Sequence, residues 1–145
     1  MSKADIPKLN LALKAEHYAI YGYGVVGARQ TGPVRAQTTA LWEAHRARRD
    51  QLAGLVTAEG GRPAASEPSY PMPAAKSPAA LAALLEDAVL DGYVALSGAS
   101  TGTLRRLAAQ AMQEAMNRRV RWARAGTEEA FPGLNPSDVT PSSSP

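Results

Sequence analysis

Apolar residues recur at every third or fourth position through most of the chain, a spacing that is typical of amphipathic helices. This pattern predicts four long helices, at about residues 7–30, 34–59, 78–98 and 103–125. Asp5 is expected to cap the first helix, with Pro7 in its first turn. No alternation of strand and helix patterns is present that could build a parallel sheet, so we predict an all-α protein.

Glycine, proline and serine separate these helices in two different ways. Short breaks at residues 31–33 and 100–102 predict two antiparallel helical hairpins. Residues 61–77, between the hairpins, are rich in proline and cannot form a regular helix. An extended chain advances about 3.3 Å per residue and a helix about 1.5 Å, so this segment can cross the whole bundle. We therefore predict a ferritin-like four-helix bundle of two antiparallel hairpins joined by a long Pro-rich crossover.

A short internal repeat supports two related hairpins. Residues 16–23 and 86–93 each begin with a glutamate and end with glycine and tyrosine at the same distances. The matching pairs are Glu16 and Glu86, Gly22 and Gly92, and Tyr23 and Tyr93. Such a repeat is consistent with a bundle whose two halves are related by a pseudo-two-fold axis.

The stretch GYGVVG at residues 22–27 has the spacing of a dinucleotide-binding fingerprint, and Glu43 follows at a tolerable distance. That fingerprint requires a strand before the glycines and a helix after them. Here the glycines lie inside a helical pattern, so we interpret the match as a coincidence. Gly22, Gly24 and Gly27 are expected instead to let a neighbouring helix or a bulky side chain approach closely.

The composition of the 145 residues indicates one folded domain with a core of Ala, Leu and Val, since 45% of the residues are hydrophobic but only 6% aromatic. We place this domain at residues 1–134 and a disordered tail, rich in serine and proline, at residues 135–145. The absence of cysteine excludes disulfide and thiolate sites. Since the sequence shows neither a signal peptide nor a membrane span, we expect a cytoplasmic protein.

The formal net charge is +3, and its excess comes from arginines. Runs of this kind are usually solvated helix faces, and we predict that role here. The alternative is an arginine-mediated binder of nucleic acid or of an acidic partner. In that case Arg118 and Arg119 would contact phosphates while Trp122 stacks on a base.

Polar residues interrupt the apolar stripes of the predicted helices at matching levels. Glu16 lies in the middle of the first stripe, and His45 and Arg48 lie in the second. Glu86 and Glu114 fall at the margins of the third and fourth stripes. The two hairpin turns would place Glu16 level with His45, and Glu86 level with Glu114. One potential ligand from each helix would then lie in a single layer.

In outline this layer is the di-metal site of a ferritin-like bundle, which uses a Glu from each of two helices and Glu-x-x-His from each of the other two. Iron and manganese are the cations that favour such a mixture of oxygen and imidazole ligands. Trp42 and Asn117, however, stand where the pattern needs a further Glu and a further His. The predicted metal ligands Glu16, His45, Glu86 and Glu114 therefore form an incomplete, degenerate site.

The interpretation that we favour is a metal-free structural cluster, in which Glu16 pairs with His45 and Arg48. Arginine is a poor neighbour for a divalent cation, and no cofactor is expected in this case. Catalytic residues are not predicted either, because His17 and His45 are the only histidines and no Gly-x-Ser-x-Gly motif is present.

Four segments carry a resemblance to a known family: LKAEHYAIYGYGVVGAR (13–29), AHRARRDQLAGL (44–55), YPMP (70–73) and AFPGL (130–134). On these segments the chain resembles an actinobacterial ferritin-like family of uncharacterised function. The resemblance implies a ferritin-like four-helix bundle that often self-associates. It implies no reaction and no catalytic residues.

Taken together, the sequence predicts a non-enzymatic, self-associating module, as a homodimer, with a degenerate metal-site layer and an unidentified protein or small-molecule partner. The first alternative is an iron- or manganese-binding oxidoreductase or storage protein that uses Glu16, His45, Glu86 and Glu114. The second is the arginine-mediated binder of nucleic acid or of an acidic partner.

Overall fold

The computed structural model describes residues 1–130, and the predicted tail at 135–145 lies outside this range. Four α-helices make up most of it: α1 (Ile6–Ala28), α2 (Gly32–Ala58), α3 (Pro78–Gly92) and α4 (Gly102–Ala130). Two short 3₁₀ helices accompany them, η1 (Lys3–Asp5) and η2 (Ala95–Gly98). Within residues 1–130 no strand is present, so the predicted all-α, ferritin-like bundle is confirmed.

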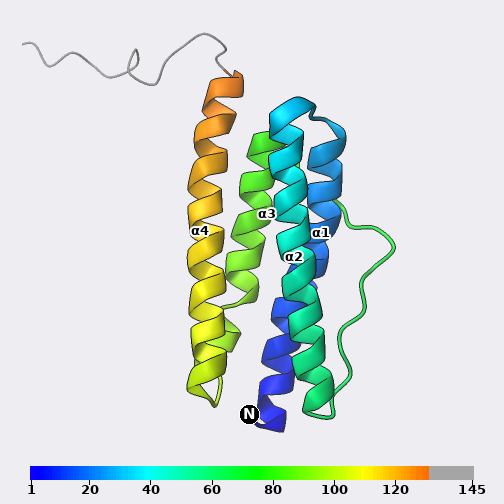
Figure 1. Ribbon diagram of the computed structural model, residues 1–145, viewed down its shortest axis with the longest axis vertical. Helices are drawn as coiled ribbons and strands as arrows, with labels where there is room; N and C mark the ends of the chain where they lie inside the picture. The colour runs from blue at the N-terminus through cyan, green and yellow to red at the C-terminus, as the bar shows by residue number, and fades with distance from the viewer. Residues whose placement is uncertain (131–145) are drawn as a thin grey trace, which may run out of the picture.

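Helices α1 and α2 form one hairpin, and α3 and α4 form the other (Figure 1). The two hairpins meet along α1 and α3, which pack closely against each other. The core between them consists of leucine, alanine, valine and tyrosine side chains, including Leu9, Leu13, Leu52 and Leu85. Helix α2 packs against α1, and α4 packs against α3, so that these two helices flank the central pair.

The third helix is shorter than predicted, because α3 ends at Gly92 and the chain continues into η2 rather than as α-helix to residue 98. Gly92 packs against α1 so closely that a Cβ atom on it would clash with the Cβ of Ala15. Directly after it, Tyr93 turns into the core and is fully buried. Helix α3 therefore ends at the point where Gly92 contacts α1 and the next residue, Tyr93, enters the core.

The prolines of the link between α2 and α3 keep it extended along the outside of the bundle, beside α1 (Figure 1). Asn10 holds its first part, since its side-chain amide donates to the carbonyl of Arg62 (3.1 Å) and accepts from the amide of Ala64 (2.8 Å). Nε2 of His17 lies 2.8 Å from the carbonyl oxygen of Ala64. Further along, the ring of Tyr70 packs on α1 against two other tyrosines. The crossover is thus fastened to α1 by polar and aromatic contacts.

The GYGVVG stretch lies inside α1 with no strand before it, so the structure lacks the context of a dinucleotide site. Of its three glycines, Gly22 serves close packing, because a Cβ there would clash with the side chain of Leu85. A Cβ on Gly27 would lie 3.6 Å from a methyl group of Thr38, which is an ordinary van der Waals contact. For Gly24 the packing prediction is wrong, since no atom outside its own stretch of α1 lies within 4 Å of the position of its Cβ. Gly24 is exposed and lines a hollow between α1 and α2, where the two helices are not in close contact.

Asp5 takes the N-cap position of α1 as predicted, but its side chain makes no capping hydrogen bond there. Instead, its carboxylate accepts hydrogen bonds from the backbone amides of Ser2 and Ser100, both at 2.9 Å, and from the Ser100 hydroxyl. These hydrogen bonds, led by that of the Ser100 hydroxyl, hold the pKa of Asp5 well below its usual range. Asp5 therefore joins the start of the chain to the turn before α4.

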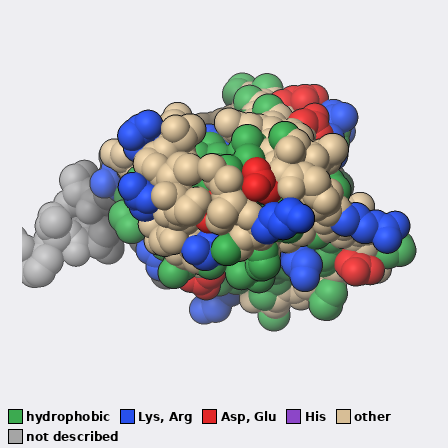
Figure 2. Space-filling model, turned by 90° about the horizontal axis from the view of Figure 1, so that it is seen from below, with side chains coloured by type: hydrophobic (Ala, Val, Ile, Leu, Met, Phe, Trp, Pro, Cys, Tyr) green, Lys and Arg blue, Asp and Glu red, His purple; other side chains and the backbone are tan. Residues whose placement is uncertain are grey.

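The end of the bundle at which the chain starts carries basic and acidic side chains that are interspersed rather than gathered (Figure 2). Most arginines of the described residues are exposed, in agreement with the prediction that they belong to solvated faces. Every helix of the described region falls short of the length and apolar character needed to cross a membrane.

Candidate functional site: a buried polar layer and the cavity beside it

Three of the predicted ligands meet in the middle of the bundle. Glu16 on α1, His45 on α2 and Glu86 on α3 are all at most 2% exposed. Nδ1 of His45 lies 2.5 Å from Oε2 of Glu16, and Nε2 lies 2.9 Å from Oε1 of Glu86. Both nitrogens of the imidazole are therefore occupied by carboxylates. Glu86 is fully buried, which corrects the prediction that it lies at the margin of its helix.

Two tyrosines complete this group. The hydroxyl of Tyr93 donates to Oε1 of Glu16 (2.6 Å), and that of Tyr23 donates to Oε1 of Glu86 (2.7 Å). We call Glu16, Tyr23, His45, Glu86 and Tyr93 the buried polar layer. The internal repeat explains its arrangement, because the tyrosine of each repeat binds the glutamate of the other. His45 lies between the two glutamates and links them.

Trp122 closes the layer from the side of α4. Its indole Nε1 donates to the hydroxyl of Tyr23 (3.0 Å), and the ring of Tyr23 stacks on that of His45 with 5.3 Å between centroids. Neither tyrosine nor Trp122 is among the residues predicted for the site. The repeated Glu–Tyr spacing was the signal that could have identified the two tyrosines.

The surroundings favour a charged imidazole. Burial by itself would lower the pKa of His45, but the hydrogen bonds to Glu16 and Glu86, together with their charges, outweigh burial and raise it to about 9. Only an imidazolium can donate from both ring nitrogens, which is what two carboxylate acceptors require. Burial and the neighbouring carboxylates raise the pKa values of Tyr23 and Tyr93, so both remain neutral donors.

Glu114 and Arg48 lie outside this layer, and the structure corrects the prediction for each. Arg48 Nη2 donates to Oε2 of Glu114 (3.0 Å) rather than to Glu16. Arg118 approaches the same oxygen at 3.9 Å, and Gln110 donates to the other carboxylate oxygen (3.2 Å). The carboxylate of Glu114 is about one-third exposed, so it serves as the shared partner of two arginines at the surface.

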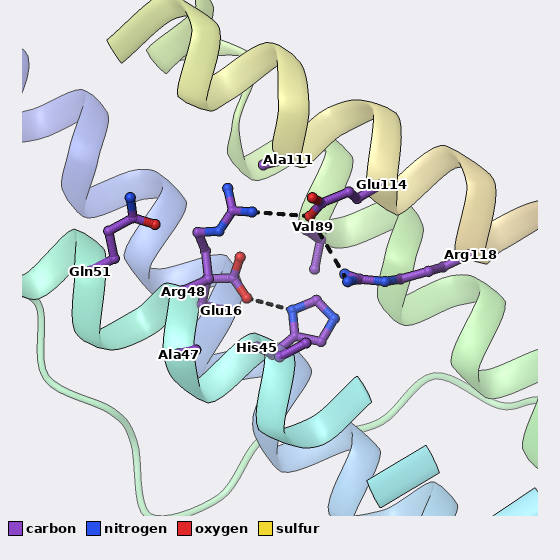
Figure 3. A pocket seen from close by; sticks show the side chains of 10 residues that line it. Glu16, His45, Ala47, Arg48, Gln51, Val89, Ala111, Glu114 and Arg118 are labelled. Carbon is purple, nitrogen blue, oxygen red and sulfur yellow. Dashed lines mark hydrogen bonds and ion pairs between the residues drawn. The ribbon is translucent and has the colours of Figure 1, made fainter. Parts of the chain in front are cut away.

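A cavity of about 300 Å³ lies between α2 and α4, beside the buried polar layer (Figure 3). Glu16 and His45 form its inner side, while Arg48, Glu114 and Arg118 stand around its outer part. Small side chains line the rest, among them Ala44, Ala47, Val89 and Ala111. We call this space the α2–α4 cavity.

The residues present do not fit the di-metal centre of ferritin-like bundles. A ligating histidine must offer a free lone pair, whereas both ring nitrogens of His45 are held by carboxylates. Trp42 stands three residues before His45, where a di-metal site has a glutamate. The guanidinium carbon of Arg46 lies 4.5 Å from the centroid of its ring. Glu114 is already bound to Arg48. The described residues accordingly contain no group of three His, Asp or Glu side chains arranged to hold a metal ion.

The arginine run of α4 does not present a stacking surface for nucleic acid. Trp122 is only 5% exposed, and its indole is engaged in the buried polar layer. Arg119 forms an ion pair with Asp87 on α3, and Arg118 faces Glu114. The aromatic side chain needed for the second alternative is therefore inside the protein.

Two helical hairpins, a long crossover and a central layer of glutamate and histidine define a ferritin-like protein. The chain belongs to the family described as Domain of unknown function (DUF4439), whose model matches residues 8–136. The resemblance to a ferritin-like family of unknown function is thereby confirmed. No match was found among curated proteins.

Solved structures agree with this assignment. A conserved hypothetical protein from Mycobacterium tuberculosis is 30% identical with a TM-score of 0.80, over 91% of this chain and 95% of its own. This relative is the support for the actinobacterial part of the resemblance.

Two more distant structures share the fold. A dodecameric thioferritin, the bacterioferritin-related protein of Bacteroides fragilis, is 20% identical with a TM-score of 0.68, over 90% of this chain and 91% of its own. A ferritin-like, diiron-carboxylate protein of Bacillus anthracis is 19% identical with a TM-score of 0.66, over 86% and 99%.

Proposed function

We propose that this protein is a non-enzymatic, self-associating binding module whose ferritin-like layer is held together by a proton instead of a metal. The observation that carries the proposal is the position of His45, whose two ring nitrogens bond Glu16 and Glu86. An imidazolium there supplies positive charge between two buried carboxylates, which is what a cation does in a di-metal bundle.

The tyrosines support the same proposal. A buried carboxylate needs several donors, and Tyr93 and Tyr23 donate to Glu16 and Glu86 at 2.6 and 2.7 Å. On Glu16 the donors cover both carboxylate oxygens. On Glu86 they share Oε1, and Oε2 has no hydrogen-bond partner among the described residues. A layer built in this way fixes the rotation of three helices about their axes and leaves the neighbouring cavity free for another role.

Metal content tests the proposal directly. Protein purified without a metal-affinity tag would be incubated anaerobically with Fe(II) or Mn(II), desalted and subjected to elemental analysis. We expect far less than one metal ion per chain, both as purified and after loading. Near-stoichiometric metal that is lost in Glu16→Gln and His45→Gln would contradict the proposal and favour the metal-binding alternative.

Self-association is the second part of the proposal. Gly22 and Gly92 serve packing inside the chain, against Leu85 and Ala15, and are not free to form a subunit interface. Large apolar side chains on the outside are better candidates for a homodimer interface. Met116 and Val120 are 53% and 42% exposed and lie one turn apart on α4.

Light scattering coupled to gel filtration tests this part. We expect a mass twice that of one chain, which falls to the monomer mass in the Met116→Lys/Val120→Lys double variant. Val94→Lys is the matched control, because Val94 is equally exposed but follows α3. A monomeric wild-type protein at high concentration would refute self-association without bearing on the polar layer.

A further inference from the structure

We propose that the α2–α4 cavity binds a small organic acid, whose carboxylate lies between Arg48 and Arg118. This inference rests on the proposed function, because it assigns a ligand class to the binding module and assumes a layer without metal. The proposed site is the outer part of the cavity, whose residues do not belong to the buried polar layer.

An unsatisfied donor is the first observation. Nη1 of Arg48 is buried and finds no hydrogen-bond partner in residues 1–130, whereas Nη2 of the same guanidinium donates to Glu114. A buried donor without an acceptor is costly, and a guanidinium group offers parallel donors that match the two oxygens of a carboxylate. An acceptor with the geometry of a carboxylate would satisfy Nη1 of Arg48.

The second observation is an excess of positive charge in this part of the cavity. Arg48 and Arg118 come from facing helices and reach the same carboxylate, that of Glu114 (Figure 3). Arg118 is held only loosely, at 3.9 Å, so one arginine charge lacks a close partner. On the inner side, His45 offsets only one of the two charges of Glu16 and Glu86, so that side stays negative. An added anion is therefore favoured at the arginines and not deeper inside.

The shape of the cavity limits the remainder of the ligand. About 300 Å³ is at the lower end of the size of small-molecule sites. Ala44, Ala47 and Ala111 keep the space open, and Val89 adds an apolar surface. These walls suit a short apolar body, and the exposed Gln51 at the rim suits entry from solvent. A carboxylate with a small aliphatic or aromatic body would place its charge at the arginines and its body against the alanines and Val89.

NMR spectroscopy of arginine side chains tests the inference on the full chain. Acetate, butyrate, benzoate and inorganic phosphate would be titrated separately while the Nε–H resonances are followed. We expect butyrate or benzoate to shift the resonances of Arg48 and Arg118 saturably and more strongly than acetate. The resonance of Arg119, which pairs with Asp87 away from the cavity, should not move.

Three variants locate the site. Arg48→Lys keeps the charge but loses the parallel donors, and Arg118→Gln loses the second cation, so each should raise the dissociation constant at least tenfold. Ala111→Leu fills the cavity without changing any charge and should likewise raise the dissociation constant at least tenfold. Arg119→Gln is the matched control and should bind like the wild-type protein.

The outcomes separate this inference from the proposed function. Absence of a saturable shift with every carboxylate, or unchanged affinity in Arg48→Lys and Ala111→Leu, would overturn the inference even if the protein is free of metal. Phosphate that binds as well as butyrate would overturn the assignment to an organic acid. A metal-loaded protein would overturn the proposed function, whatever the titrations show.

Discussion

At the scale of single residues, His45 has the central position, because it joins three helices through two carboxylates. Its pKa in the folded protein is about 9, against an ordinary value of about 6.5 in an unfolded chain. A group whose pKa rises on folding stabilises the folded state when it is protonated. The contribution is complete below about pH 6.5 and is lost as the pH rises through about 9.

We therefore predict that the free energy of unfolding falls between pH 6.5 and pH 9.5, by roughly 3 kcal/mol from this group. Urea unfolding at several pH values, followed by circular dichroism, measures it. His45→Gln should be less stable at neutral pH and should lose most of this pH dependence. Parallel pH profiles for the two proteins would show that His45 is not the titrating group.

The tyrosine hydroxyls provide a second test at this scale. Tyr93→Phe removes the donor to Glu16 without changing the packing of the ring, and it leaves a buried carboxylate oxygen without this partner. We expect a loss of about 1.5–3 kcal/mol, as is typical of hydrogen bonds to charged groups. Chemical denaturation measures the loss. The control is Tyr70→Phe, whose hydroxyl lies on the crossover and only accepts from the backbone of Glu67, so it should cost much less.

At the scale of elements, the close contact between α1 and α3 depends on small residues. The Cβ of Ala15 is fixed to its backbone and cannot move aside for a side chain at position 92. Leu85, which faces Gly22, can move its flexible end and is more tolerant. The two hairpins therefore have their least adjustable contact at Gly92.

Gly92→Ala should destabilise the protein by about 1–3 kcal/mol through overpacking between α1 and α3. The matched control is Gly24→Ala, at an open position of α1, which should stabilise it by up to about 1 kcal/mol through helix propensity. Thermal unfolding of both variants distinguishes the two effects. If both substitutions stabilise the protein, the helices are not in close contact at Gly92.

At the scale of the whole molecule, one carboxylate ties the start of the chain to the second hairpin. Asp5 accepts from Ser100 across the end of the bundle, and these hydrogen bonds lower its pKa. A carboxyl group whose pKa falls on folding stabilises the protein above its unfolded pKa, near 4. This contribution is lost as the pH falls through the folded value.

Asp5→Ala should therefore loosen this connection at neutral pH and leave the buried polar layer in place. Hydrogen exchange measures the effect, and the amide of Ser100 should exchange faster while the amides in the middle of α1 keep their rates. The control is Asp50→Ala, which removes an exposed carboxylate paired with Arg49 on α2. Unchanged protection of Ser100 in Asp5→Ala would show that the hydrogen bond does not close this end.

The sequence by itself determined the elements and their connections. Apolar periodicity predicted four helices, the breaks predicted two hairpins, and the prolines of residues 61–77 predicted the crossover. The same periodicity turned Glu16 and His45 inward, because a helical face is fixed by spacing alone. The repeated Glu–Tyr spacing was equally visible in the sequence, although its meaning was not.

Only the tertiary structure decided which groups pair. Periodicity gives the face of a helix, but not its shift along or its rotation about the axis of the bundle. For this reason the burial of Glu86 and the crossed bonds of Tyr23 and Tyr93 could not be predicted. A long side chain can also point in several directions from the same helix position. The guanidinium of Arg48 therefore binds Glu114 instead of Glu16. The close approach at Gly22 but not at Gly24 also depends on where a neighbouring helix passes.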